Sequence, residues 1–138
     1  VFNAQQATGI SVAERTEHFD TASFCLSKGL GAPVGSLLVG TAALIHKANW
    51  VRKSLGGGMR QSGILAAAGI YALENHVERM AEDHDRASTL AQNLSKAGYT
   101  TTKPATNMVY VTVRDGPMAQ QMLEKNGVRC LAVSASSS

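Results

Sequence analysis

The chain has 138 residues, of which 44% are hydrophobic, 5% aromatic and 17% charged. This composition is typical of a globular chain with an apolar core, and it excludes an intrinsically disordered protein. The formal net charge is +3. The basic residues form no dense run and aromatic residues are few, so we expect no nucleic-acid partner.

No apolar stretch approaches the roughly 18 residues that a membrane span needs, and no signal peptide is visible. The default expectation is a soluble, cytoplasmic protein without a membrane partner. The chain begins at Val1 without a methionine and ends on a serine tail directly after an apolar run at 128–133. We therefore expect a piece of a longer protein.

The first forty residues predict a hairpin preceded by helical segments. Residues 1–9 are compatible with a short helix or with irregular structure. Ser11 begins a helix signal, with Glu14 three residues later as its capping-box partner. Two short apolar runs, 22–26 and 36–40, indicate strands, and the segment between them is rich in glycine. Strands so close in sequence predict an antiparallel hairpin with a wide loop.

The middle of the chain predicts two helices separated by a glycine-rich break. Thr41 is suited to cap a helix over 42–55. The segment 55–63, LGGGMRQSG, interrupts the pattern. The longest periodic stretch then runs from 62 to 97, and Gly98 ends it. We predict one long helix there, whose first half is apolar on all sides and therefore buried.

The C-terminal part changes pattern. Residues 108–113 alternate and predict a strand, 118–125 predict a helix, and 128–133 predict a second strand. This order indicates a small, incomplete α/β layer. The long helix would then join a domain over 1–80 to an incomplete small domain over 81–138.

Lys28 is the first candidate for chemistry. In the segment FCLSKGLGAPVG it stands where a buried strand should become a glycine-rich loop. A lysine amine is nucleophilic only when deprotonated, and burial near other cations lowers its pKa. Glycines let the backbone approach a planar ring. These features suit a lysine that forms an imine with a carbonyl cofactor, although a solvated lysine is the commoner occupant of a strand end.

A second candidate is the glycine-rich break. Three glycines at 56–58, the donor fork of Arg60 and the helix start at Ser62 would suit an anion. A flexible linker accounts for the same residues. Arg52 and Lys53 make the end of the preceding helix cationic, which the helix dipole alone can explain.

The remaining titratable residues indicate structure rather than chemistry. His46 and His76 are expected to be solvated, whereas His84 falls on the apolar stripe. The histidines show no metal-ligand spacing, so we expect no metal site. Cys25 and Cys130 stand in apolar surroundings, which favours two buried reduced thiols over a disulfide or a metal site. An acidic cluster on the long helix is expected to face solvent: Glu78, Glu82, Asp83 and Asp85.

Two blocks of the sequence, FCLSKGLGAPVGSLLVG and WVRKSLGGGMRQSGILAAAGIYAL, closely resemble the threonine aldolases. The resemblance continues through AEDHDRA to TNMVYV. Threonine aldolases are pyridoxal-phosphate (PLP) enzymes of fold type I, the aspartate-aminotransferase fold. The resemblance therefore implies an α/β chain that forms part of a PLP-dependent large domain plus the start of the small C-terminal domain.

The same resemblance implies a function and a set of site residues. The enzyme would be a lyase of threonine catabolism that cleaves L-threonine or L-allo-threonine to glycine and acetaldehyde. Lys28 would hold PLP covalently. Arg60 would lie near the cofactor phosphate, reaching across a subunit interface, with Lys53 near the same site. Ser27 would help to position the lysine or the phosphate.

The resemblance also bears on assembly and completeness. The family is usually a dimer of dimers, so a homotetramer is expected. Its pyridinium-pairing aspartate, ring-stacking histidine and substrate-carboxylate arginine have no counterpart here, and we expect the 138 residues alone to show little turnover. Two alternatives remain: another fold type I PLP enzyme, such as a β-eliminating lyase or a serine hydroxymethyltransferase-like protein, or a truncated non-catalytic homologue.

Overall fold

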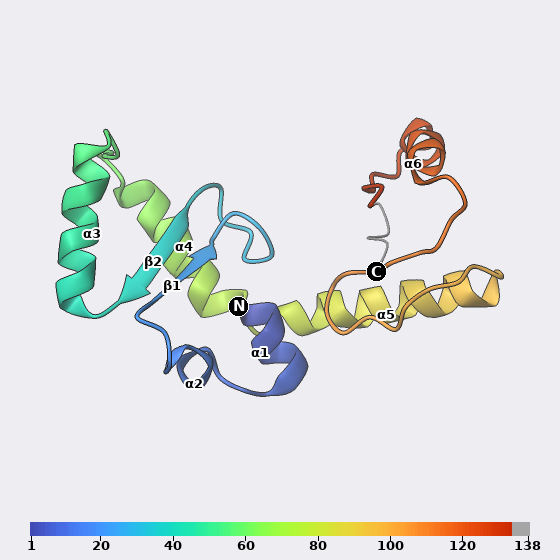
Figure 1. Ribbon diagram of the computed structural model, residues 1–138, viewed down its shortest axis with the longest axis horizontal. Helices are drawn as coiled ribbons and strands as arrows, with labels where there is room; N and C mark the ends of the chain where they lie inside the picture. Colours follow the sequence, from blue (N-terminus) through green and yellow to red (C-terminus); the bar gives the residue numbers. More distant parts are fainter. Residues whose placement is uncertain (134–138) are drawn as a thin grey trace.

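The structure, a computed structural model, describes residues 1–133. Residues 134–138, the end of the predicted small domain, lie outside this range. The helices are α1 (Phe2–Thr8), α2 (Val12–Thr16), α3 (Ala42–Ser54), α4 (Gly63–Asn75), α5 (Met80–Lys96) and α6 (Gly116–Lys125), and the strands are β1 (Thr21–Cys25) and β2 (Ser36–Gly40). Figure 1 shows α1 to α4 gathered around the hairpin, α5 leading away from it to the right, and α6 above α5 in this view.

The predicted antiparallel hairpin is confirmed. Strand β1 pairs with β2 so that Thr21 faces Gly40 and Cys25 faces Ser36. The ring of Phe24 on β1 meets the ring of Phe2 on α1 edge to face, with 5.2 Å between centroids. The hairpin is thereby fastened to the N-terminal helix.

The predicted helix starts in this region are confirmed as well. The Ser11 hydroxyl accepts the Glu14 N–H at 3.1 Å, and α2 is only five residues long. The Thr41 hydroxyl accepts the Leu44 N–H at 3.4 Å at the start of α3. Side-chain caps of this kind satisfy amide groups that the first turn of a helix leaves without a partner.

The prediction of a single helix over 62–97 is wrong. Helix α4 ends at Asn75 and α5 begins at Met80. At the junction the Val77 carbonyl accepts the side-chain amide of Gln6 at 3.1 Å, and His76 bonds to a loop 46 residues earlier in the chain. These tertiary bonds favour a break between the two helices over one continuous helix. Residues 76–79 contain no glycine or proline, so the local sequence gives no sign of the break. Helix α5 does end as predicted, with Gly98 at φ +89.

A small apolar core joins the hairpin loop to this junction. The buried members come from the loop, from α4 and from the start of α5: Leu26, Leu30, Ala32, Ala72 and Met80. The prediction that the first half of the long helix is buried on all sides is wrong for this chain. Ile64 is 85% exposed, and only Gly69 and Ala72 of α4 are buried, because nothing else in residues 1–133 packs on the remaining faces.

The C-terminal part keeps its predicted helix but not its predicted strands. Helix α6 is confirmed, and the Asp115 carboxylate caps it by accepting the Met118 N–H at 2.9 Å. Segments 108–113 and 128–133 form no strand, since in the described part of the chain their pairing is limited to an isolated bridge between Val111 and Thr101. A strand needs a neighbouring strand for its ladder of hydrogen bonds. Within residues 1–133 no helix is long and apolar enough to cross a membrane.

Candidate functional site

The loop between β1 and β2 carries Lys28 (Figure 1). Its base is closed by two backbone bonds, from the Leu26 N–H to the Gly35 carbonyl at 2.9 Å and from the Ala32 N–H to the Leu26 carbonyl at 3.0 Å. Inside the loop, the Gly31 N–H donates to the carbonyl of Lys28 itself at 2.8 Å. The path of the backbone around the lysine is therefore fixed by hydrogen bonds.

Burial divides the loop into an anchor and an exposed tip. Leu26 and Leu30 are 6% and 1% exposed, whereas Ser27 and Lys28 are exposed. Lys28 is exposed because Leu26 and Leu30, two residues before and after it, take the core positions. Lys28 is therefore exposed to solvent on a loop whose base is hydrogen-bonded and buried.

The glycines of this loop are required by the loop's own shape. Gly31 has φ +71, in the left-handed region that favours glycine. A Cβ on Gly29 would lie 3.3 Å from the Met80 methyl carbon, closer than most packed side chains allow. That the glycines also make room for a cofactor ring stays a prediction.

The turn between α3 and α4 is defined by backbone bonds rather than being an open linker. The Gly57 N–H donates to the Arg52 carbonyl at 2.7 Å. A Cβ on Gly57 would lie 2.9 Å from that same carbonyl oxygen, so no larger residue fits without a shift. The Lys53 Nζ would lie 3.4 Å from a Cβ on Gly58. Its amine is therefore folded over the turn.

The predicted site residues do not converge within the described part of the chain. Arg60 is exposed in the α3–α4 turn, and Ser62 begins α4 as predicted, although its hydroxyl makes no capping bond. Figure 1 shows this turn at the upper left, next to α3, and the β1–β2 loop on the other side of β2. Lys28 thus lies on the β1–β2 loop, whereas Lys53 and Arg60 lie at the glycine-rich α3–α4 turn.

His76 is the residue whose role the sequence did not reveal. It was expected to be solvated, but it is half-buried and its Nδ1 lies 2.6 Å from the Leu30 carbonyl. Its ring also meets Tyr71 edge to face at 5.5 Å. His84 is half-buried, with Nε2 2.9 Å from the Asn3 side-chain oxygen. Both partners are far away in sequence, so periodicity could not indicate these bonds.

The remaining candidates behave as structural groups. The acidic cluster lies on an exposed face, as predicted, where Arg86 bonds to Glu82 and to Asp83 at 3.0 Å each. Both cysteines are free but exposed, so the prediction of burial is wrong. Cys25 ends β1 at an outward position of its alternating pattern.

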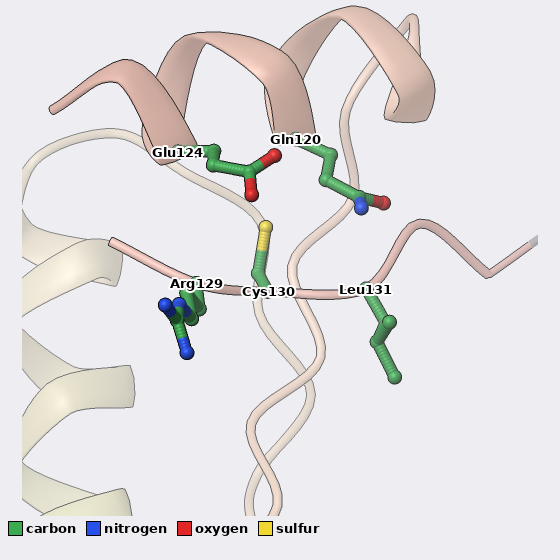
Figure 2. A pocket seen from close by; sticks show the side chains of 5 residues that line it. All are labelled: Gln120, Glu124, Arg129, Cys130 and Leu131. Atoms are coloured by element: carbon green, nitrogen blue, oxygen red, sulfur yellow. The ribbon is translucent and has the colours of Figure 1, made fainter. Parts of the chain in front are cut away.

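A cavity of about 330 Å³ lies beside α6 and is lined by Gln120, Glu124, Arg129, Cys130 and Leu131. Figure 2 shows the Cys130 thiol pointing toward Glu124. The cavity contains none of the predicted site residues. Within residues 1–133, no group of three or more His, Cys, Asp or Glu side chains is arranged to hold a metal ion.

The sequence model of the beta-eliminating lyase family matches residues 1–116. The chain belongs to this family. A family member from Escherichia coli K12, named low specificity L-threonine aldolase, is 55% identical over 113 residues, which are 82% of this chain and 34% of that protein. Low-specificity L-threonine aldolase 1 of Arabidopsis thaliana is 41% identical over 93% of this chain and 38% of its own length. The chain thus spans about a third of these relatives.

Two solved structures share the fold of this chain. One is assigned as an aromatic amino acid beta-eliminating lyase/threonine aldolase from Exiguobacterium sp. 255-15, with a TM-score of 0.77 over 96% of this chain and 40% of that one, at 24% identity. The other is assigned as an L-allo-threonine aldolase from Listeria monocytogenes, with a TM-score of 0.73 over 99% of this chain and 40% of that one, at 23% identity. They confirm the predicted α/β fold class. The boundary between large and small domain near residue 80 stays a prediction.

Proposed function

We propose that the protein containing this chain is a PLP-dependent carbon–carbon lyase that cleaves L-threonine or L-allo-threonine to glycine and acetaldehyde. The observation that carries the proposal is the exposed Lys28 on a loop fixed by hydrogen bonds, within a chain 55% identical to a named L-threonine aldolase. We place this enzyme in threonine catabolism in the cytoplasm.

The residues present fit the two reactive ends of PLP. An aldehyde calls for an amine that solvent and cofactor can reach, and Lys28 is exposed. A phosphate calls for cations and free donors, which Arg60 and Lys53 supply beside a glycine-shaped turn. PLP, when bound, withdraws electrons from the amino acid that it activates.

The chain's own contributions are attachment and orientation. Lys28 would hold the cofactor covalently, and its exposed amine could carry a proton. Arg60 and Lys53 bind the phosphate and so fix the position of the ring against the lysine. Ser27, exposed next to Lys28, assists in orienting the lysine or the phosphate.

The rest of the site has to come from outside these residues. We infer from the threonine-aldolase resemblance that the pyridinium partner and the substrate-carboxylate arginine lie elsewhere in the protein. We therefore expect little turnover from the 138 residues on their own. We also propose that the working form is a homo-oligomer, a dimer of dimers, in which Arg60 serves the Lys28 of a partner.

A β-eliminating lyase is the second candidate, and the family match favours it. The two activities differ in product, since an aldolase releases acetaldehyde from threonine whereas β-elimination yields a keto acid and ammonia. Assaying the intact protein for both products with threonine and serine separates them. Absence of both products would leave a non-catalytic homologue as the better description.

Covalent trapping tests the proposal directly. The intact protein is incubated with PLP and reduced with borohydride, and the modified peptide is identified by mass spectrometry. We expect a pyridoxyl group on Lys28 and none on the exposed Lys47 or Lys53. Lys28→Ala should abolish both the adduct and acetaldehyde release while leaving the fold intact. Full activity of Lys28→Ala would overturn the proposal.

A further inference from the structure

His76 connects the junction between α4 and α5 to the loop that carries Lys28. Its Nδ1 lies 2.6 Å from the carbonyl oxygen of Leu30, a residue 46 positions away in sequence. A carbonyl oxygen can only accept a hydrogen bond, so Nδ1 must carry the hydrogen and donate it. The bond thus reaches the backbone two residues beyond Lys28.

The bonded peptide group in turn holds the lysine. The carbonyl of Leu30 and the N–H of Gly31 belong to one planar peptide unit. The carbonyl end accepts from His76, and the N–H end donates to the Lys28 carbonyl at 2.8 Å. Hydrogen bonds linked in this way strengthen one another. The orientation of one peptide plane therefore couples the imidazole to the backbone of the lysine.

Packing keeps the imidazole in place against this peptide. A Cβ on Gly31 would lie 3.5 Å from His76 Nδ1, so the ring and the loop backbone are in close contact. Leu30 is 1% exposed and belongs to the same core as Met80, the first residue of α5. On the other side of the junction, Gln6 bonds to the Val77 carbonyl at 3.1 Å. The junction that carries His76 is therefore held in place by contacts on both sides.

We infer that His76 is a positioning residue for Lys28: it fixes the Leu30–Gly31 peptide and thereby the backbone from which the lysine reaches the cofactor. The inference rests on the proposed function, because it assigns to Lys28 the attachment of PLP. It adds a residue that touches neither cofactor nor substrate. A 1 Å displacement of a reacting group can cost a large factor in rate, so a support of this kind matters for the chemistry.

The test uses three variants of the intact protein. His76→Ala removes the donor. His76→Asn replaces it, because the asparagine Nδ2 stands close to where the histidine Nδ1 stood and also donates. His84→Ala is the matched control, since His84 is also half-buried and its bond goes to a distant residue on α1, Asn3, rather than to the carbonyl of Leu30.

Two measurements are made on each variant. The first is amide hydrogen exchange of the peptide covering residues 26–35 without PLP, which reports opening of the loop. The second is the rate at which PLP is captured on Lys28, followed by borohydride quenching at fixed times. We expect His76→Ala to raise exchange of the Gly31 amide and to slow capture, each by about tenfold. His76→Asn should recover most of both losses, and His84→Ala should change neither.

Equal exchange of residues 26–35 in His76→Ala and wild type overturns the inference, as does a loss in His76→Ala that His84→Ala reproduces. Failure of the proposed function has a different signature. Suppose that wild type shows no pyridoxyl group on Lys28, while His76→Ala still raises amide exchange in the loop. The assignment of PLP to Lys28 then fails, and the role of His76 toward the cofactor is overturned, although its bond to the loop remains.

Discussion

At the scale of single residues, the backbone around Lys28 depends on Gly31. Its φ of +71 costs an alanine about 1–2 kcal/mol relative to glycine. A Cβ there would meet His76 only at ordinary contact distance, 3.5 Å, so the cost is conformational rather than steric. We therefore expect Gly31→Ala to lower the free energy of unfolding by about 1–2 kcal/mol, measured by urea denaturation of the intact protein.

Gly63→Ala is the matched control for this substitution. Gly63 begins α4, and a Cβ there would have nothing within 4 Å. Alanine favours helix over glycine by up to about 1 kcal/mol, so the control should be as stable as wild type or more stable. Equal stability of Gly31→Ala and wild type would show that the loop does not require the left-handed conformation.

At the scale of elements, α1 supports the junction between α4 and α5. The Gln6 amide donates to the Val77 carbonyl at 3.1 Å, and Asn3 bonds to His84 at 2.9 Å, so one short helix bridges the junction. Gln6→Ala leaves the carbonyl with a weaker set of partners. We expect a loss of about 1 kcal/mol in the free energy of unfolding, read from the urea midpoint.

A second glutamine separates this bond from a general effect of removing an amide. Gln92 on α5 is exposed and bonds only weakly, at 3.4 Å, to Ser88 on the same helix. Gln92→Ala should stay within about 0.5 kcal/mol of wild type. If Gln6→Ala and Gln92→Ala lower the free energy of unfolding by the same amount, the bond from Gln6 to Val77 makes no contribution of its own to stability.

The elements also show which features local sequence could predict. The caps at Ser11 and Thr41 and the stop at Gly98 depend on residues within a few positions, and the structure has all three. The junction at 76–79 depends on Gln6 and on Leu30, so no local pattern marks it. The strands expected at 108–113 and 128–133 failed for a related reason, because a strand is defined by a partner that alternation alone does not supply.

The candidate site divides in the same way. Lys28, Arg60 and Lys53 were found because they stand in specific blocks of sequence, and the roles given to them stay predictions. His76 stands in no such block, and its significance appears only when the loop is folded against it. The exposure of Lys28 agrees with the solvated lysine that is commonest at a strand end, and it depends on how Leu26 and Leu30 share the core.

At the scale of the whole molecule, the separation between the β1–β2 loop and the α3–α4 turn leads to a prediction about assembly (Figure 1). If Arg60 serves the Lys28 of a partner, Lys28→Ala and Arg60→Ala damage different components of each site. A hybrid dimer of the two variants then contains one site with both residues intact and one with neither. Random assembly of equal amounts makes half the dimers hybrid, so about a quarter of the sites should be restored.

The measurement is acetaldehyde release from threonine by the two variants co-expressed in one cell, compared with each variant alone. Co-expression of Lys28→Ala with the double variant Lys28→Ala/Arg60→Ala is the control, because no arrangement of those chains contains an intact lysine. Recovery to about a quarter of wild-type activity supports a shared site. If Lys28 and Arg60 act within one chain, no hybrid site contains both, and the mixture should show no more than the average of the two variants.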